Sequence, residues 1–262
     1  MQHNFSEHRS PILQIEDLCK AFGGNKVLRG LSFALSRGSV TALIGSNGAG
    51  KSTALNILSG LIPQDSGRVL LNGQIISGAP GYRRARKGMA RTFQQPRSFR
   101  SLTALEAVCL ARTPAPAEGL VRNIATSAMF WRSPHSKAEI AYAKSYLEQT
   151  RLIDRCNVIA ADLTYGEQKL LMLAQALAFG GALYCFDELC AGLQPSLIEH
   201  VALTIRKLVD GGMTVLFVEH NLALVREIAD HTIFLHEGRL FREGPTADVL
   251  RDPDVVRLYL GD

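Results

Sequence analysis

A glycine-rich loop between a predicted strand and a predicted helix constrains this chain more than any other feature. The loop matches the pattern GxxxxGK[ST] and consists of Gly45, Ser46, Asn47, Gly48, Ala49, Gly50, Lys51 and Ser52. Glycines let such a loop turn tightly, so that backbone N–H groups and the following helix start face phosphate oxygens. We predict that Lys51 reaches the outer phosphates of a nucleotide and that the Ser52 hydroxyl binds Mg²⁺. A glycine turn that holds a lysine by coincidence is the alternative, and the strand–loop–helix context disfavours it.

Strands and helices alternate after this loop. Apolar runs bounded by glycine or turn residues predict buried strands at residues 39–44, 182–186 and 214–218. Helical spacing predicts helices at residues 51–58, 138–149, 168–178 and 221–229. Thr164 with Glu167, and Ser196 with Glu199, fit the capping-box pattern at a helix start. This alternation predicts an α/β protein with a parallel sheet.

Composition excludes several classes of protein. Of the 262 residues, 47% are hydrophobic and 20% are charged, which excludes a disordered chain and allows a sizeable core. The net charge of +5 fits an anionic partner without identifying it. The five cysteines show no CxxC pair, which favours reduced, packed thiols over a metal site. We expect neither a membrane span nor a signal peptide, because no apolar run is long enough and the first residues are polar.

Two segments are ambiguous from sequence. Residues 79–100 are rich in arginine, which is typical of a solvated face, although contact with a nucleotide, a membrane surface or a partner is the alternative. Residues 112–136 contain several prolines and predict a loop or broken-helix insertion whose function composition does not reveal.

Polar residues follow two of the predicted strands. The strand at 182–186 leads into Asp187 and Glu188, whose side chains diverge because side chains alternate along a strand. Asp187 is predicted to join the Mg²⁺ shell, and Glu188 to act as general base toward the attacking water. His220 follows the next strand, at the edge where parallel sheets bind ligands, and is a candidate for the γ-phosphate. An acidic loop and an ordinary surface histidine are the simpler alternatives, and Gln94 is uninformative by itself.

Together, these motifs resemble the ATPase subunits of ABC transporters, and the resemblance covers nearly the whole chain. The matching segments are the Walker A loop at 45–52, the Q-loop glutamine Gln94, the signature at 163–168, the end of Walker B at 186–188, the D-loop at 191–194 and the switch histidine His220. The resemblance implies an α/β P-loop NTPase fold with a mostly parallel sheet, an N-terminal antiparallel β part and a helical subdomain. We therefore expect one ATPase domain over residues 1–262, with its nucleotide-binding core at 1–93 and 160–240, its helical subdomain at 94–159 and its tail at 241–262.

The resemblance also implies roles for individual residues. Glu188, His220 and Gln94 would be catalytic, and Ser52, Gln94 and Asp187 would bind Mg²⁺. Beyond the glycine-rich loop, ATP would contact Phe22, Thr53, Thr164, Tyr165, Gly166 and Glu167. Two positions depart from the family pattern: Leu189 replaces a proline after Glu188, and Gln194 replaces an acid or amide in the D-loop.

A narrower resemblance is to the ATP-binding subunits of branched-chain amino-acid uptake systems. It rests on residues 91–94, on the Thr-Tyr-Gly-Glu form of the signature and on the ending at 252–262. It implies a head-to-tail dimer with a second ATPase subunit, closed by ATP between a P-loop and the partner's signature. It also implies transmembrane permeases, a periplasmic substrate-binding protein, a place at the cytoplasmic face of the membrane and no nucleic-acid partner.

Other functions remain open from sequence alone. Within transporters, the alternatives are urea or amide uptake and lipopolysaccharide export, whose ATPases have a similar tail. A soluble ABC ATPase of DNA repair is disfavoured because the chain lacks sustained heptads. A nucleotide-dependent binding module with weak hydrolysis is suggested by Leu189 and Gln194.

Overall fold

The computed structural model describes residues 10–92, 101–112 and 136–260. The chain divides into two compact units. The first unit contains Met1–Gln94, Gly181–Ala191 and Pro195–Asp262, and the second contains Gln95–Gly180 and Gly192–Gln194. Within the described part of the chain, no helix has the length and apolar character needed to cross a membrane.

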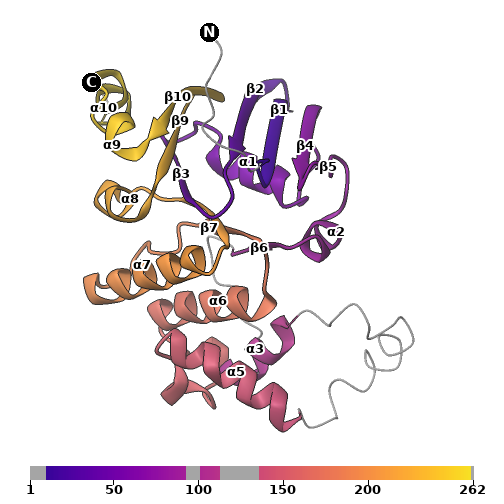
Figure 1. Cartoon of the computed structure of the whole chain (residues 1–262), viewed down its shortest axis with the longest axis vertical. Helices are drawn as coiled ribbons and strands as arrows, with labels where there is room; N and C mark the ends of the chain where they lie inside the picture. Colours follow the sequence, from indigo (N-terminus) through magenta and orange to yellow (C-terminus); the bar gives the residue numbers. More distant parts are fainter. Residues whose placement is uncertain (1–9, 93–100, 113–135, 261–262) are drawn as a thin grey trace. The chain divides into compact units, whose positions relative to one another are not determined.

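The first unit contains two sheets (Figure 1). An antiparallel sheet has the strand order β2-β1-β4-β5, and a second, mostly parallel sheet has the order β10-β9-β3-β8-β7-β6. The strands are β1 (Leu13–Phe22), β2 (Asn25–Leu35), β3 (Val40–Gly45), β4 (Ser66–Leu71), β5 (Gln74–Ile75), β6 (Met89–Arg91), β7 (Leu183–Asp187), β8 (Thr214–Val218), β9 (His231–His236) and β10 (Arg239–Pro245).

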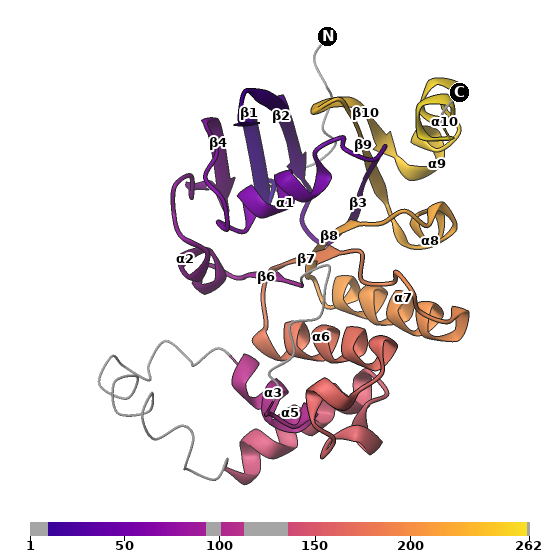
Figure 2. The same cartoon turned by 180° about the vertical axis from the view of Figure 1, so that it is seen from behind.

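The helices of the first unit follow or connect these strands, and Figure 2 shows the same elements from behind. They are α1 (Lys51–Leu58), α2 (Gly81–Arg86), α7 (Pro195–Asp210), α8 (Leu222–Ile228), α9 (Thr246–Val249) and α10 (Pro253–Leu260). The predicted helix at 51–58 and the predicted strand at 214–218 are confirmed with the same bounds, and the other predicted elements shift by one to three residues. The α/β fold is likewise confirmed.

The topology places three strand ends at one edge of the parallel sheet. β3 lies between β9 and β8, and β8 pairs in parallel with β7. Because parallel strands end at the same edge, the segments that follow β3, β7 and β8 are brought together. The glycine-rich loop, the Asp187–Glu188 pair and His220 belong to these segments.

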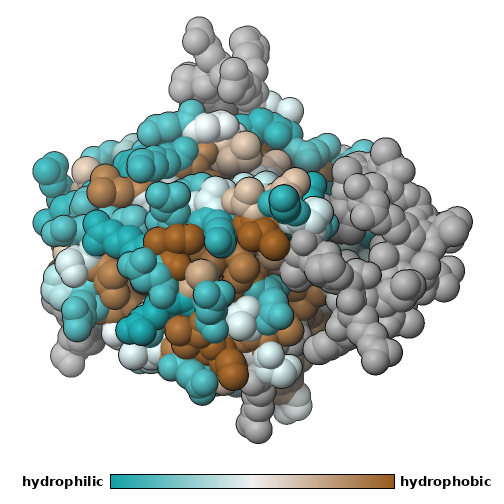
Figure 3. Space-filling view, turned by 90° about the horizontal axis from the view of Figure 1, so that it is seen from below, coloured by the Kyte–Doolittle hydropathy of each residue, from teal (hydrophilic) through white to brown (hydrophobic). Residues whose placement is uncertain are grey.

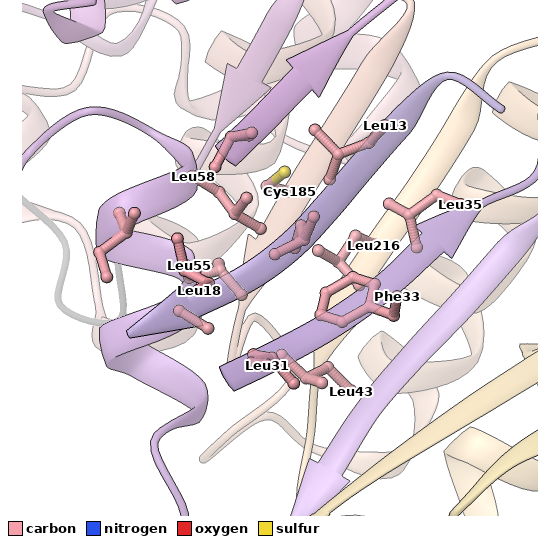
Figure 4. Close-up of a cluster of buried hydrophobic side chains, with 14 of the residues drawn as sticks. Leu13, Leu18, Leu31, Phe33, Leu35, Leu43, Leu55, Leu58, Cys185 and Leu216 are labelled. Carbon is pink, nitrogen blue, oxygen red and sulfur yellow. The ribbon is translucent and has the colours of Figure 1, made fainter. Parts of the chain in front are cut away.

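A continuous apolar core fixes the helix that follows the loop. Figure 4 shows side chains of β1, β2, α1 and the parallel sheet gathered in one cluster. Leu55 and Leu58 of α1 are fully buried there, in the same cluster as Leu18 of β1 and Leu216 of β8. Burying a leucine contributes about 1.5–3 kcal/mol, so packing of this face holds α1 and its first turn in place.

The second unit is helical. In residues 101–112 and 136–180, its elements are α3 (Ala104–Ala111), α5 (Lys137–Gln149), α6 (Tyr165–Phe179), and two short 3₁₀ turns, η1 (Ile153–Arg155) and η2 (Ala160–Asp162). Each of these three described α-helices begins with a complete capping box, at Thr103, Ser136 and Thr164. The unit extends to Gly180, because α6 packs against α3 and α5.

Three sequence-based expectations have clear structural outcomes. The capping box at Ser196 is wrong, since α7 begins at Pro195 and Ser196 lies inside its first turn, as suits a proline at the first helical position. All five cysteines are free. The basic stretch is not simply a solvated face, because two of its arginines, Arg84 and Arg91, have buried guanidinium groups.

Candidate functional site

The glycine-rich loop has a backbone that other residues would not tolerate. Gly45 ends β3 at φ 153°, and a Cβ atom there would lie 2.3 Å from the carbonyl oxygen of Leu235. Gly50 has φ 101°, and its Cβ would lie 2.7 Å from a methyl carbon of Leu28. These two glycines let the chain turn back closely against β9 and β2. The turn leads directly into α1, whose start no described side chain caps, so its first N–H groups are available to an anion.

Lys51 is folded back over the loop. Its Nζ donates hydrogen bonds to the carbonyl oxygens of Gly45, at 2.7 Å, and Ser46, at 3.0 Å. Burial lowers the pKa of Lys51, and the negative charges of Glu188 and Asp187 oppose that shift. The Lys51 ammonium group is thus held at the loop and interacts electrostatically with both carboxylates. Of the neighbouring predicted residues, Ser52 is exposed and Thr53 is half-buried in the first turn of α1.

Asp187 forms a buried ion pair that the sequence did not predict. Arg91 Nη2 lies 3.1 Å from Asp187 Oδ2, and both side chains are less than a tenth exposed. The same guanidinium donates to the end of α1, at the Leu55 carbonyl, Asn56 Oδ1 and Ser59 Oγ. Burial lowers the pKa of Arg91, which Asp187 counteracts. Arg91 therefore ties Asp187 to the helix that follows the loop.

Glu188 and His220 meet at the edge of the sheet. Glu188 Oε1 lies 2.9 Å from His220 Nε2, although the residues are 32 positions apart in the chain. Glu188 has a left-handed backbone, with φ 48°, and its N–H donates to the Val218 carbonyl at 2.9 Å. This conformation costs a non-glycine residue strain energy, and such strained residues are common at functional sites. The structure thus joins two residues that the sequence proposed separately.

The next residues are held by a buried carboxylate. Glu219 Oε1 accepts a hydrogen bond from the Cys190 N–H at 2.9 Å. Leu189, the departure from the family pattern, is 2% exposed and packs in the core of the first unit. Gln194, the other departure, is exposed in the second unit. Sequence reasoning assigned no site role to Glu219 or Arg91. The available signal was position: Glu219 directly precedes His220, and Arg91 lies three residues before Gln94.

The predicted signature residues form the start of α6. The Thr164 side chain accepts from the Glu167 N–H at 3.3 Å, and Glu167 Oε2 accepts from the Thr164 N–H at 2.9 Å. The predicted capping box is therefore confirmed. Glu167 also pairs with Arg155 at 2.9 Å. These hydrogen bonds, that of the Thr164 N–H first, lower the pKa of Glu167.

The capping box modifies the expectation for this helix start. One of its N–H groups, that of Glu167, is already bonded to Thr164 and is not free for an anion. Tyr165 is half exposed, and a Cβ at Gly192 would lie 3.1 Å from its ring. A residue larger than glycine at position 192 would therefore displace Tyr165, and Gly166 lies beside it in the first turn.

Phe22 and Gln94 are the remaining predicted site residues. Phe22 ends β1 with its ring half exposed, and Lys20 Nζ lies 5.4 Å from the ring centroid. An exposed aromatic ring can stack on a nucleotide base. Gln94 lies outside the described residues.

The donor atoms at the sheet edge fit a magnesium ion. Ser52 offers a hydroxyl and Asp187 a carboxylate, which are the oxygen ligands that Mg²⁺ takes alongside substrate phosphates. Across residues 10–92, 101–112 and 136–260, no group of three or more His, Cys, Asp or Glu side chains is placed to hold a metal ion. A site completed by phosphate oxygens and water needs no such group.

This loop at the head of α1, on a parallel sheet flanked by an antiparallel one, defines a P-loop ATPase. Residues 28–191 match the ABC transporter family. The chain belongs to that family and is an ABC-type ATPase.

Curated relatives match nearly the full length of the chain. The branched-chain amino acid transport ATP-binding protein BraF of Pseudomonas aeruginosa is 34% identical over 96% of this chain and 98% of its own. LivG of Escherichia coli strain K12, of the same description, is 32% identical with the same coverage. The solved structure of a nucleotide-free ATP-binding cassette from an ABC transporter superposes with a TM-score of 0.82, at 30% identity, covering 97% of this chain and 100% of that one. An ADP-bound cassette gives the same TM-score and identity.

Proposed function

We propose that this protein is the ATP-hydrolysing subunit of an importer for branched-chain or related amino acids. The contact between Glu188 and His220, at the sheet edge that carries the phosphate-binding loop, is the observation that carries the hydrolytic part. The substrate class rests on the near full-length similarity to BraF and LivG.

The chemistry follows from the arrangement of charges. The loop 45–52, with Lys51, binds the β- and γ-phosphates of ATP, and Phe22 stacks on the adenine. Glu188 accepts a proton from the attacking water. His220, which contacts the Glu188 carboxylate, orients that carboxylate and hydrogen-bonds the γ-phosphate. Ser52, Asp187 and Gln94 would hold Mg²⁺, which would neutralise the charge that develops on the phosphates. Arg91 keeps the Asp187 carboxylate in place.

Hydrolysis requires a second subunit in this proposal. Thr164 and Gly166 at the start of α6 contact the γ-phosphate held by the partner's loop, so that ATP closes a head-to-tail dimer and hydrolysis releases it. A ligand that binds the closed state more tightly shifts the population toward it. The positive end of the α6 dipole favours such an anion.

The proposal includes membrane partners. Transmembrane permeases dock on the helical subdomain, and a periplasmic protein delivers the amino acid, with this chain at the cytoplasmic face and no nucleic acid involved. The second unit exposes Leu110 and Ile159, which are 43% and 40% exposed. Figure 3 shows one face on which hydrophobic residues form small groups among hydrophilic ones. Such groups suit a protein partner.

Transport by the reconstituted complex tests the proposal. The chain is co-expressed with its genomic neighbours that encode permeases, and the complex is placed in vesicles with ATP and Mg²⁺ on its own side and the neighbouring substrate-binding protein on the other. We expect ATP-dependent accumulation of radiolabelled leucine or valine on the ATP side, which the variant Lys51→Ala abolishes. Accumulation of urea without leucine, or outward transport of lipopolysaccharide, would contradict the substrate class.

A further inference from the structure

The helix α10 is attached to the first unit at its N-terminal end. Asp252 Oδ1 accepts hydrogen bonds from the N–H groups of Asp254 and Val255, at 2.9 and 3.4 Å, and so caps the helix. Asp252 also forms an ion pair with Arg242 of β10 at 2.8 Å, with the carboxylate side chain 13% exposed. The beginning of α10 is therefore fixed to the sheet.

The other end of α10 reaches the segment that carries His220. The Tyr259 hydroxyl donates a hydrogen bond to the backbone carbonyl of His220 at 2.7 Å, across 39 positions of the chain. The tyrosine ring packs against Phe234 of β9, with ring centroids 6.5 Å apart. Burial and the charge of Glu219 raise the pKa of Tyr259, so the hydroxyl keeps its proton at neutral pH.

The apolar packing around this bond is incomplete. A small cavity of about 70 Å³ lies beside α10 and is lined by Ile44, Leu222, Leu250, Val255, Val256 and Tyr259. Leu222, which begins α8 two residues after His220, is half-buried and faces this space. The hydrogen bond of the Tyr259 hydroxyl is therefore a specific contact between α10 and the residues before α8.

His220 is held from both sides of its peptide group. Its carbonyl oxygen accepts a hydrogen bond from the Tyr259 hydroxyl. The side chain of the next residue, Asn221, accepts from the N–H groups of Ala223 and Leu224 and so caps α8. The imidazole projects from this fixed backbone to Glu188. A shift of the His220 carbonyl would therefore move the ring relative to the carboxylate, and small displacements at a reacting centre lower rates strongly.

We propose that Tyr259 is a positioning residue for hydrolysis, acting through the His220 carbonyl to keep the imidazole at Glu188, and that α10 couples the C-terminal segment to the reaction. The inference rests on the proposed role of His220. It assigns a function to a segment that contains none of the nucleotide-binding motifs.

Tyr259→Phe tests the proposal, because it removes the hydroxyl and keeps the ring. In the purified full-length chain we expect kcat for ATP hydrolysis to fall about two- to tenfold, the effect of one hydrogen bond, with KM for ATP unchanged. The matched control is Tyr142→Phe, which removes a hydroxyl-to-carbonyl bond of 3.0 Å to Ala178 in the helical unit. The control should lose a similar amount of thermal stability and keep its kcat.

Amide hydrogen exchange gives a readout independent of activity. Tyr259→Phe should speed exchange in residues 219–224, whereas Tyr142→Phe should speed it only in the helical unit. An unchanged kcat in Tyr259→Phe, or an equal loss in both variants, overturns the positioning role. If the wild-type chain and its complex hydrolyse no ATP, the proposed function fails instead, and unchanged exchange at 219–224 then overturns the Tyr259 contact separately.

Discussion

Individual charges at the sheet edge are held by contacts that do not involve nucleotide. Lys51 donates to two carbonyl oxygens of its own loop, and Asp187 pairs with Arg91. A buried charge without partners would cost several kcal/mol, so these contacts stabilise the folded site. In the proposed mechanism, Lys51 exchanges these carbonyl oxygens for phosphate oxygens within the same loop.

Lys51→Ala should weaken ATP binding because it removes the only loop side chain with a positive charge. Charge-assisted hydrogen bonds contribute about 1.5–3 kcal/mol, so we expect the Kd for ATP to rise about 10- to 100-fold. Titration with a fluorescent ATP analogue measures this. Lys144→Ala, an exposed lysine of α5, serves as the control, and equal affinities in the two variants would contradict the role of Lys51.

At the scale of elements, α1 is fixed at both ends by other parts of the first unit. Its start follows the glycine-rich loop, and the carbonyl groups at its end accept hydrogen bonds from two buried arginines, Arg84 and Arg91. Arg84 of α2 donates to the carbonyl oxygens of Ile57 and Leu58, at 2.5 and 2.8 Å, and to that of Ala79 at 2.8 Å. Burial lowers the pKa of Arg84. These bonds satisfy carbonyl groups that a helix end leaves open.

Arg84→Met should destabilise the protein, because it leaves those buried carbonyl oxygens without donors. We expect the free energy of unfolding of the first unit to fall by about 2–4 kcal/mol. Urea denaturation followed by circular dichroism measures the loss. The neighbouring Arg86 is exposed, and Arg86→Met should change the midpoint little. A loss of the same size in Arg86→Met would show that α2 matters only through its overall charge.

At the scale of the whole molecule, the chain carries the phosphate-binding loop and the signature, the two parts from which the proposed ATP sites of the dimer are built, on separate compact units. The loop 45–52 lies in the first unit, and the signature at the start of α6 lies in the second. In the proposed dimer each part serves a different ATP, so the unit of function is a pair of chains. The oligomeric state in ATP is thus a direct test.

Glu188→Gln should bind ATP and keep the dimer closed, since the amide lacks the basicity to deprotonate water. We expect kcat to fall at least about 100-fold, in line with loss of a general base. Analytical ultracentrifugation should show an ATP-dependent dimer in this variant. Glu237→Gln is the matched control, because Glu237 is an exposed glutamate with a similar φ of 45°. Turnover near the wild-type rate in Glu188→Gln would remove Glu188 from the mechanism.

Local sequence patterns predicted most of the elements and one of the caps. The loop at 45–52, the helix after it and the capping box of Thr164 depend on residues within a few positions of one another. Short segments of sequence therefore determine their backbone conformation. The cap at Ser196 failed for a local reason too, because Pro195 suits the first helical position and begins the helix one residue earlier.

By itself, the sequence determined the phosphate-binding loop, the alternating strands and helices and the family. Only the tertiary structure decided the partners of the functional side chains: Arg91 with Asp187, Glu188 with His220 and Tyr259 with the His220 carbonyl. These pairs are 96, 32 and 39 positions apart. No local pattern encodes them, because strand order and core packing bring such residues together. The same arginine-rich stretch that predicts a solvated face therefore supplied two buried charges.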